Sequence, residues 1–338
     1  MKKLLALLAL LALTSCSGGP DTAPTSPSVE SPAAHSDDAG AAALTIGLTY
    51  IPDVQFAPVY VALEKGYFAD EGLEVTIRHH GAQESLLGAL QSGEEDVVFA
   101  GGDEMMQARS TGVDVVNWAT MYQRYPVVLI AKADSGITSP ADLAGKTVGL
   151  PGPYGENYFG LLAMQKAYGL EDMQVDYIGY TQSAALSSGQ VDAIIGFTNN
   201  DAVSMRHAGI DVVEMPLVEG NLPLVGVGLG SINVEPETMS KVLSAMEKAT
   251  ADASADLDGT LDIVESYVPT LAEPDQRELA GEVLKATLKL YTGGESFGAQ
   301  DERAWEAMSG FLEETGVLEK PVSATDAYTL DVLKARTK

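Results

Sequence analysis

The chain has 338 residues, of which 46% are hydrophobic, so it is long enough for two domains with buried cores. Its 48 acidic residues outnumber its 20 basic residues and leave a formal net charge of −28. Such an acidic surface repels phosphate groups, which excludes a nucleic-acid-binding protein and a basic patch that adheres to anionic lipid.

Residues 1–16 have the features of a secretory signal peptide. A short basic start precedes an apolar segment, residues 4–13, which is too short to span a membrane as a stable helix. The segment ends in LTSC, which resembles the lipobox of bacterial lipoproteins, so we expect Cys16 to be lipidated. Because Cys16 is the sole cysteine, the sequence excludes an internal disulfide, a cysteine metal site and a cysteine nucleophile.

After the signal peptide, residues 17–43 are rich in Ser, Pro, Ala and Gly and predict a disordered linker. From residue 44 onward, strand-like and helix-like segments alternate. ALTIGLTYI predicts a strand, APVYVALEKG a helix, LEVTIR a strand, ESLLGALQSG a helix and DVVFAGG a strand. This alternation predicts an α/β fold with largely parallel sheets.

An internal repeat indicates two similar lobes. ALQSGEEDVVFAGGD, residues 89–103, and ALSSGQVDAIIGFTNN, residues 185–200, share one plan. In each, a helix ends in Ser-Gly, an aspartate follows three residues later, and an apolar strand runs into a polar loop. We expect these aspartates, Asp96 and Asp192, to bond the backbone at the turn from helix to strand.

The repeat divides the chain into segments. We expect residues 44–131 to form the first part of lobe one and residues 132–225 to form lobe two. A glycine-rich strand, LVGVGLGSI, then returns the chain to lobe one, whose second part, residues 226–338, is mainly helical. Two crossings between lobes make a two-strand hinge, and ligands favour such an interface.

Several stretches resemble a known family. YIPDVQFAPVYVALEKGYFADEGLEVTI resembles the opening lobe of ABC-importer solute-binding proteins for thiamine-pyrimidine precursors, riboflavin and related heterocycles. TMYQRYPVVLIAKADSGI, GKTVGLPGPYGENYFGLLA and IGYTQSAALSSGQVDAIIGFTNND are most similar to the riboflavin-binding branch. The resemblance covers residues 44–335 and implies a two-lobed periplasmic-binding-protein fold of type II. The chain departs from the family at Asp53, where Asn is usual, and at GENYFG, where a small residue usually precedes Ser-Tyr.

Loops that follow the predicted strands supply the candidate ligand site. They carry aromatic side chains, which stack on flat rings, and amides and carboxylates, which bond ring edges and hydroxyl groups. The candidate ligand-binding residues are Gln55, Phe56, Asp103, Tyr122, Tyr154, Asn157, Tyr158, Tyr180, Asn199, Asn200 and Asp201. Tyr50 is expected in the core or at the rim. Arg124 is the sole cation near these loops, which disfavours phosphate, sulfonate or carboxylate ligands.

The remaining motifs give no sign of phosphate binding, metal binding or catalysis. GLPGPYGENYFG, residues 149–160, lacks the spacing of a dinucleotide fingerprint and of a P-loop, so we expect it to shape a pocket rather than to hold phosphate. His79 and His80 have no partner at metal-ligand spacing and are expected to be exposed. The sequence has no H-E-x-x-H motif and no P-loop lysine motif, and no catalytic residue, metal or cofactor is assigned.

The resulting hypothesis is an extracytoplasmic receptor of an ABC importer, anchored to the cell membrane through Cys16. It would bind a neutral heterocycle between its lobes and deliver it to a membrane permease, acting as a monomer. Riboflavin is the favoured ligand, and a thiamine-pyrimidine precursor of the hydroxymethylpyrimidine type is the alternative. A pyrimidine-forming enzyme of the same fold is the least favoured interpretation, because the resembling fungal enzyme has a cysteine-rich motif that this chain lacks.

Overall fold

In the computed structural model, the described residues are 41–81, 84–170 and 172–336. The predicted signal peptide, the lipidation site at Cys16 and most of the predicted linker lie outside this part of the chain. The linker was predicted to end at residue 43, whereas the first strand, β1, already begins at Ala42. Among the described residues, no helix is long and apolar enough to cross a membrane.

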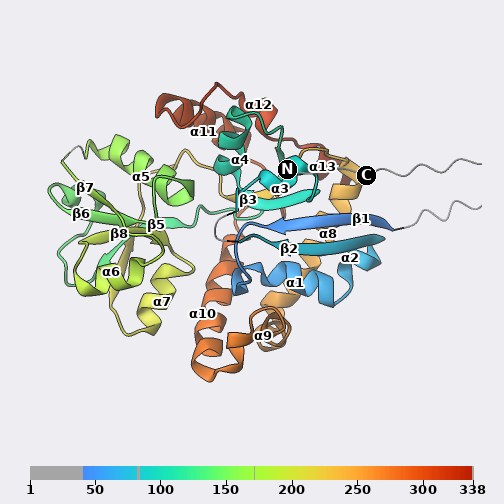
Figure 1. Cartoon of the computed structure of the whole chain (residues 1–338), viewed down its shortest axis with the longest axis horizontal. Helices are drawn as coiled ribbons and strands as arrows, with labels where there is room; N and C mark the ends of the chain where they lie inside the picture. Colours follow the sequence, from blue (N-terminus) through green and yellow to red (C-terminus); the bar gives the residue numbers. More distant parts are fainter. Residues whose placement is uncertain (1–40, 82–83, 171, 337–338) are drawn as a thin grey trace, which may run out of the picture. The chain divides into compact units, whose positions relative to one another are not determined.

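Two five-stranded sheets form the centres of two lobes (Figure 1). The sheet of lobe one has the order β2-β1-β3-β10-β4, with strands β1 (Ala42–Leu48), β2 (Leu73–His79), β3 (Val97–Gly101), β4 (Val116–Thr120) and β10 (Val227–Ser231). The sheet of lobe two has the order β7-β6-β8-β5-β9, with strands β5 (Val127–Lys132), β6 (Thr147–Leu150), β7 (Gln174–Tyr177), β8 (Ala193–Phe197) and β9 (Val212–Met215).

Both sheets are mixed. In each sheet, the strand that follows a crossing between the lobes is antiparallel to the other four strands. In lobe one, β1 pairs in parallel with β2 and β3, while β10 is antiparallel to β3 and β4. In lobe two, β6 pairs in parallel with β7 and β8, while β5 is antiparallel to β8 and β9. The predicted α/β fold with mostly parallel sheets and a two-strand hinge is confirmed, with β10 and β5 as the antiparallel strands of the two sheets.

The first crossing between lobes comes earlier than the predicted boundary between residues 131 and 132. Strand β5 belongs to the sheet of lobe two, so the chain leaves lobe one between Thr120 and Val127. The predicted boundary was wrong because an apolar strand such as VVLIAK is equally suited to either sheet. The second crossing lies between β9 and β10, as expected, because β10 pairs with lobe-one strands.

Helices cover both faces of each sheet. Those of lobe one are η1 (Val54–Phe56), α1 (Ala57–Glu64), α2 (Tyr67–Asp70), α3 (Gly88–Ser92), α4 (Gly102–Ser110), α8 (Pro236–Ala255), α9 (Leu257–Glu265), η3 (Pro269–Ala272), α10 (Pro274–Leu290), α11 (Glu302–Glu314), α12 (Ala324–Ala327) and α13 (Asp331–Arg336). Those of lobe two are η2 (Pro140–Leu143), α5 (Gly155–Tyr168), α6 (Gln182–Ser188) and α7 (Asp201–His207).

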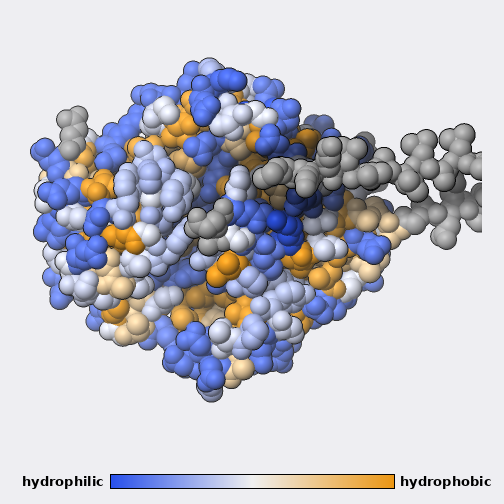
Figure 2. Space-filling view, in the orientation of Figure 1, coloured by the Kyte–Doolittle hydropathy of each residue, from blue (hydrophilic) through white to orange (hydrophobic). Residues whose placement is uncertain are grey.

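Alternation along the strands directs side chains to two cores in each lobe. In β3, Val97 and Phe99 face the core that includes α1 and α8, whereas Val98 and Ala100 face the core beside α3 and α4. In lobe two, Leu129 of β5 faces α5, and its neighbour Ile130 faces α6 and α7. On the face shown in Figure 2, hydrophilic residues predominate and apolar ones form only small groups, in keeping with the acidic composition.

The two copies of the repeat fold alike. Each helix ends at a glycine with left-handed geometry, Gly93 (φ 77°) and Gly189 (φ 76°). Three residues later, Asp96 Oδ2 accepts a hydrogen bond from the Thr45 amide at 2.8 Å, and Asp192 Oδ2 accepts one from the Thr147 amide at 2.9 Å. The prediction that both aspartates bond the backbone is therefore confirmed.

A third connection between the lobes comes from the C-terminal helices. Trp305, Met308 and Leu312 of α11 are fully buried in one apolar cluster with Met106 of α4 and Phe159 of α5. The cluster therefore contains side chains of both lobes and of the second crossing. We call it the interlobe core; its buried members are Met106, Phe159, Ala163, Val218, Leu224, Val225, Trp305, Met308, Phe311, Leu312, Val322, Ala324 and Ala327.

Candidate functional site

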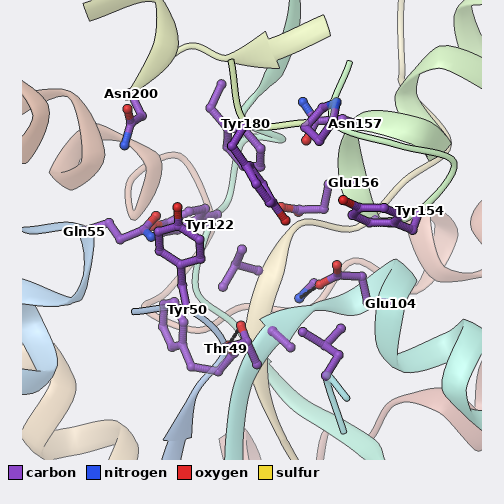
Figure 3. A pocket seen from close by; sticks show the side chains of 18 of the residues that line it. Thr49, Tyr50, Gln55, Glu104, Tyr122, Tyr154, Glu156, Asn157, Tyr180 and Asn200 are labelled. Carbon is purple, nitrogen blue, oxygen red and sulfur yellow. Dashed lines mark hydrogen bonds between the residues drawn. The ribbon is translucent and has the colours of Figure 1, made fainter. Parts of the chain in front are cut away.

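A cavity of about 350 Å³ lies between the lobes and is lined by residues of both (Figure 3). This volume lies within the range of small-molecule sites. The lining residues are Thr49, Tyr50, Gln55, Phe56, Leu86, Phe99, Ala100, Gly101, Glu104, Tyr122, Pro151, Tyr154, Gly155, Glu156, Asn157, Tyr180, Gln182, Phe197, Asn200, Asp201 and Val227.

Most of the lining residues follow the carboxyl ends of parallel strands. Thr49 follows β1, Gly101 ends β3, Pro151 follows β6, Tyr180 follows β7 and Asn200 follows β8. Because parallel strands end at one edge of a sheet, these loops meet at the same side of each lobe. The chain topology therefore accounts for the position of the cavity.

Three tyrosines supply exposed aromatic surface to the cavity. Tyr50 of lobe one is 38% exposed, and Tyr154 and Tyr180 of lobe two are 52% and 65% exposed. The rings of Tyr50 and Tyr180 face each other from opposite lobes, with centroids 6.3 Å apart and a tilt of 57°. Exposed aromatic side chains at an interface between lobes are suited to stack on a flat ring.

A second aromatic group forms the floor on the side of lobe one. Phe56 and Tyr122 are buried and both pack edge-to-face against Phe99, at centroid distances of 5.9 Å and 6.1 Å. Burial raises the pKa of Tyr122 well above its usual value, so its hydroxyl keeps its proton at neutral pH. The floor is thus rigid and apolar, with one hydroxyl group.

The polar part of the wall consists of amides and carboxyl groups. Gln55, Asn157, Gln182 and Asn200 supply amides. The Asn157 Nδ2 group donates to the main-chain oxygen of Ile195 at 2.8 Å, which ties the start of α5 to β8. The other amides supply donors and acceptors that suit a polar ring edge.

Three carboxyl groups line the cavity, those of Glu104, Glu156 and Asp201. Asp201 accepts a hydrogen bond from the Phe197 amide at 2.8 Å, and burial raises the pKa of its carboxyl to about 6. None of the lining residues in the described part of the chain is Lys, Arg or His. The site thus offers an anion no positive charge.

Most of the candidate ligand residues line this cavity. The structure brings together Gln55, Phe56, Tyr122, Tyr154, Asn157, Tyr180, Asn200 and Asp201. It places Asp103, Tyr158 and Asn199 outside the lining. For these three, the predicted position in the site was wrong.

Each of these three side chains has a structural role behind the cavity. Asp103 is fully buried and accepts a hydrogen bond from the Tyr125 hydroxyl at 2.6 Å. Asn199 is 1% exposed, and its Nδ2 group donates to Thr287 Oγ1 at 2.9 Å, which links lobe two to α10. Tyr158 packs against the core of lobe two and against the interlobe core.

Sequence reasoning missed other parts of the lining. Thr49, Glu104 and Glu156 were not assigned, and Tyr50 was expected in the core or rim, although its ring lines the cavity. Two of these residues could have been suspected because they are next to assigned ones in the sequence. Glu104 follows Asp103 at the start of α4, and Glu156 precedes Asn157 at the start of α5. Helix phase decides which of two neighbours faces the cavity, and the sequence does not reveal it here.

The glycine-rich loop before α5 shapes the lobe-two wall. Gly155 has a φ of +70°, a left-handed conformation that favours glycine. At Gly152, a Cβ atom would lie 2.3 Å from the Tyr154 ring, so glycine gives this ring its place beside the backbone. The loop therefore presents Tyr154 to the cavity, in agreement with the prediction that it shapes a pocket.

The expectation that His79 and His80 are exposed was wrong. His80 is 4% exposed, and its Nε2 atom lies 2.7 Å from Glu95 Oε1. His79 Nε2 lies 3.0 Å from the Tyr60 hydroxyl. Their partners are distant in the sequence, so spacing alone could not reveal them.

A second cavity, of about 620 Å³, lies beside the hinge between α10 and lobe two. Arg124, Arg206, Lys285 and Lys289 line it together with Glu214 and Glu282. Tyr125 is its one aromatic lining residue among those described. Its basic side chains and its single aromatic residue distinguish it from the first cavity.

Two lobes that enclose a cavity at the carboxyl ends of their strands define a periplasmic-binding-protein fold. The aliphatic sulphonate binding protein SsuA of Escherichia coli has the same fold, with a TM-score of 0.67, 18% identity and coverage of 84% of this chain and 91% of that one. The chain belongs to the NMT1/THI5-like family, which matches residues 53–258.

Three of the curated relatives match most of the chain. The riboflavin-binding protein RibY of Chloroflexus aurantiacus is 32% identical over 335 residues, which is 96% of this chain and 95% of that protein. The formylaminopyrimidine-binding protein of Halalkalibacterium halodurans is 28% identical, over 87% of this chain and 92% of that protein. A 4-amino-5-hydroxymethyl-2-methylpyrimidine phosphate synthase of Legionella pneumophila is 20% identical, over 85% of this chain.

Proposed function

We propose that this protein is a non-enzymatic, extracytoplasmic receptor of an ABC importer that binds riboflavin between its lobes and delivers it to a membrane permease. The observation that carries the proposal is the cavity, which combines aromatic faces from both lobes with amides and carboxyl groups and has no cation among its described lining residues. The similarity to RibY over 96% of the chain supports the same ligand class. The receptor would act as a monomer.

The chemistry of the lining favours a neutral ligand. Phosphate, sulfonate and carboxylate ligands need positively charged or strongly donating partners, and here they would meet Glu104, Glu156 and Asp201. A flavin supplies a flat ring system for the tyrosines and ribityl hydroxyl groups for the amides and carboxyls. A thiamine-pyrimidine precursor is the second candidate, supported by the similarity to the formylaminopyrimidine-binding protein.

Titration of riboflavin with the purified mature domain tests the proposal, because stacking on tyrosine quenches flavin emission. We expect saturable quenching at micromolar protein and no saturable binding of a phosphorylated flavin under the same conditions. Absence of quenching, together with thermal stabilisation by an aminopyrimidine, would favour the second candidate instead.

Two adjacent asparagines provide a matched pair for this titration. Asn200 lines the cavity, so Asn200→Ala is expected to weaken riboflavin binding about tenfold without changing the melting temperature of the free protein. Asn199 is buried against Thr287, so Asn199→Ala is expected to lower the free energy of unfolding by about 1–3 kcal/mol. Equal effects of both substitutions on stability would contradict the assignment of Asn200 to the site.

Lipid anchoring at Cys16 is a separate part of the proposal and rests on the lipobox-like sequence LTSC. Several acyl chains on one cysteine would hold the protein at a membrane, because each buried methylene contributes about 0.8 kcal/mol. Cys16→Ser is expected to move the protein from the membrane fraction to the soluble fraction of the expressing cells. Retention of this variant in the membrane fraction would show that the anchor is elsewhere.

A further inference from the structure

The starts of two helices from opposite lobes bring three carboxyl groups together. Asp103 and Glu104 lie in the first turn of α4, and Glu156 lies in the first turn of α5. Glu104 Oε1 is within 3.2 Å of the position that a Cβ atom on Gly155 would occupy, so the two turns are close neighbours. Glu104 and Glu156 both line the cavity, whereas Asp103 lies behind it.

These carboxyl groups differ in the hydrogen bonds that they accept. Asp103 Oδ1 accepts from the Glu104 amide at 2.8 Å, and its Oδ2 accepts from the Tyr125 hydroxyl at 2.6 Å. Glu104 Oε2 accepts from the Gly101 amide at 3.0 Å. Among the described residues, none forms a hydrogen bond with the Glu156 carboxyl, and its Oε1 atom is closed off from solvent.

Hydrogen bonds from donors stabilise the ionised form of a carboxyl, so they determine which of the three keeps its proton. Asp103 has two such donors, Glu104 has one, and Glu156 has none. Burial, together with the nearby charges of Asp103 and Glu104, raises the pKa of Glu156 well above its usual value. Burial and the nearby charge of Glu104 also raise the pKa of Asp103 well above its usual value, although its two donors oppose this effect. Burial raises the pKa of Glu104, opposed by its one donor.

The remaining titratable groups around Glu156 do not offset the negative charges. The Tyr125 hydroxyl, from the first crossing, lies 3.2 Å from the main-chain oxygen of Glu156. Tyr122, Tyr154 and Tyr180 line the same cavity, and Asp201 lies at the start of α7. None of the cavity-lining residues described is a cation, so an ionised Glu156 would have no counter-charge in the wall.

We propose that Glu156 is a neutral carboxylic acid in the wall of the cavity and that it recognises a ring edge on which a hydrogen-bond donor and an acceptor are adjacent. The proposal rests on the proposed function, because it names the group that reads the heterocycle. Figure 3 shows the Glu156 carboxyl end directed toward the middle of the cavity, on the same side as Tyr154.

The chemistry of this pairing is specific. A neutral carboxylic acid carries an O–H donor and a C=O acceptor on one carbon, so two parallel hydrogen bonds can form with a complementary edge once the Glu156 carboxyl turns its enclosed Oε1 atom toward the ligand. The imide edge of a flavin, with N–H beside C=O, is such an edge, and so is the amino group beside a ring nitrogen in an aminopyrimidine. An ionised carboxylate has only acceptors and would repel the carbonyl oxygen of the imide.

The experiment compares the native protein with Glu156→Gln, Glu156→Ala and Glu219→Gln across about pH 5 to pH 8. Gln keeps a donor and an acceptor at every pH, whereas Ala has neither. Glu219 is an exposed glutamate of lobe two, so its substitution controls for the loss of one charge.

We expect riboflavin binding by the native protein and by Glu219→Gln to weaken as pH rises, because Glu156 loses its proton. Glu156→Gln is expected to bind with a weaker pH dependence than the native protein, keeping only the part that comes from Asp201, whose pKa is about 6. Glu156→Ala is expected to bind about tenfold more weakly than the native protein at the lower pH. A flavin methylated at the imide nitrogen is expected to bind the native protein at least about tenfold more weakly than riboflavin.

An unchanged pH dependence in Glu156→Gln would overturn the proposal, as would native affinity in Glu156→Ala or for the methylated flavin. The melting temperature without ligand tests the protonation of Glu156 even if riboflavin is not the ligand. A carboxyl with a raised pKa loses stability as pH rises through that pKa, so the melting temperature of Glu156→Gln minus that of the native protein should increase with pH. A difference that is constant with pH would refute the neutral acid even if riboflavin does not bind.

Discussion

Replacing Trp305 with alanine is expected to lower the free energy of unfolding by about 3–5 kcal/mol, the usual cost of truncating a buried tryptophan. Trp305 is fully buried in the interlobe core, where its ring stacks on Tyr328 at a centroid distance of 5.3 Å. Its Nε1 group donates to Gln300 Oε1 at 2.9 Å, so the substitution also removes a partner from a polar side chain. Urea denaturation followed by circular dichroism measures the loss.

This substitution is also expected to change how the protein unfolds. The interlobe core contains Phe159 of lobe two and Met106 of lobe one, so its loss should uncouple the lobes and produce two unfolding transitions. Trp118→Ala is the matched control, because Trp118 is equally buried but packs within lobe one alone. A single transition in both variants would contradict the coupling role of the interlobe core.

Glu95→Ala is expected to destabilise lobe one, because it removes a buried carboxylate and its hydrogen bonds. The Glu95 side chain is fully buried, and its Oε1 atom is 2.7 Å from both Arg78 Nη1 and His80 Nε2. Removing Glu95 leaves the buried His80 ring without this partner, which typically costs about 1–3 kcal/mol. Arg78 contributes less to the loss, because its side chain is 31% exposed and keeps its ion pair with Glu84.

The adjacent residue is a close control for this prediction. Glu94 is exposed, and its carboxyl lies 3.9 Å from the same Arg78 side chain. Because solvent screens such a pair, Glu94→Ala is expected to cost less than about 1 kcal/mol. Equal losses of unfolding free energy in the two variants would show that burial does not make Glu95 a stronger partner of Arg78 than Glu94.

Local patterns in the sequence were sufficient to predict much of the fold. The repeat around Asp96 and Asp192 was visible because both lobes use the same turn from helix to strand, with the aspartate on the backbone of a neighbouring strand. The strand VVLIAK was assigned to the wrong lobe, because its apolar pattern does not specify its partners. Strand pairing depends on residues distant in sequence, in this case β8 and β9.

The candidate site could also be predicted only in part, in this case at the level of single residues. The loops that form the cavity could be predicted, but which neighbour faces inward could not. Asn200 lines the cavity while Asn199 is buried behind it, and Glu104 lines it while Asp103 does not. Successive residues of a helix point about 100° apart, so a small change in helix phase exchanges their roles. Glu156 was missed for another reason, since its assigned neighbour Asn157 also lines the cavity.

The composition of the interlobe core has a consequence for the order in which the chain acquires its structure during synthesis. Phe159 and Ala163 of lobe two share the interlobe core with Trp305 and Phe311, which are synthesised well after lobe two. Until those residues emerge, the apolar side of α5 has no cover, and lobe two cannot reach its final stability. A truncated product that ends before α11 would expose this surface and would therefore be prone to aggregation and degradation, although it would contain every residue of the cavity lining.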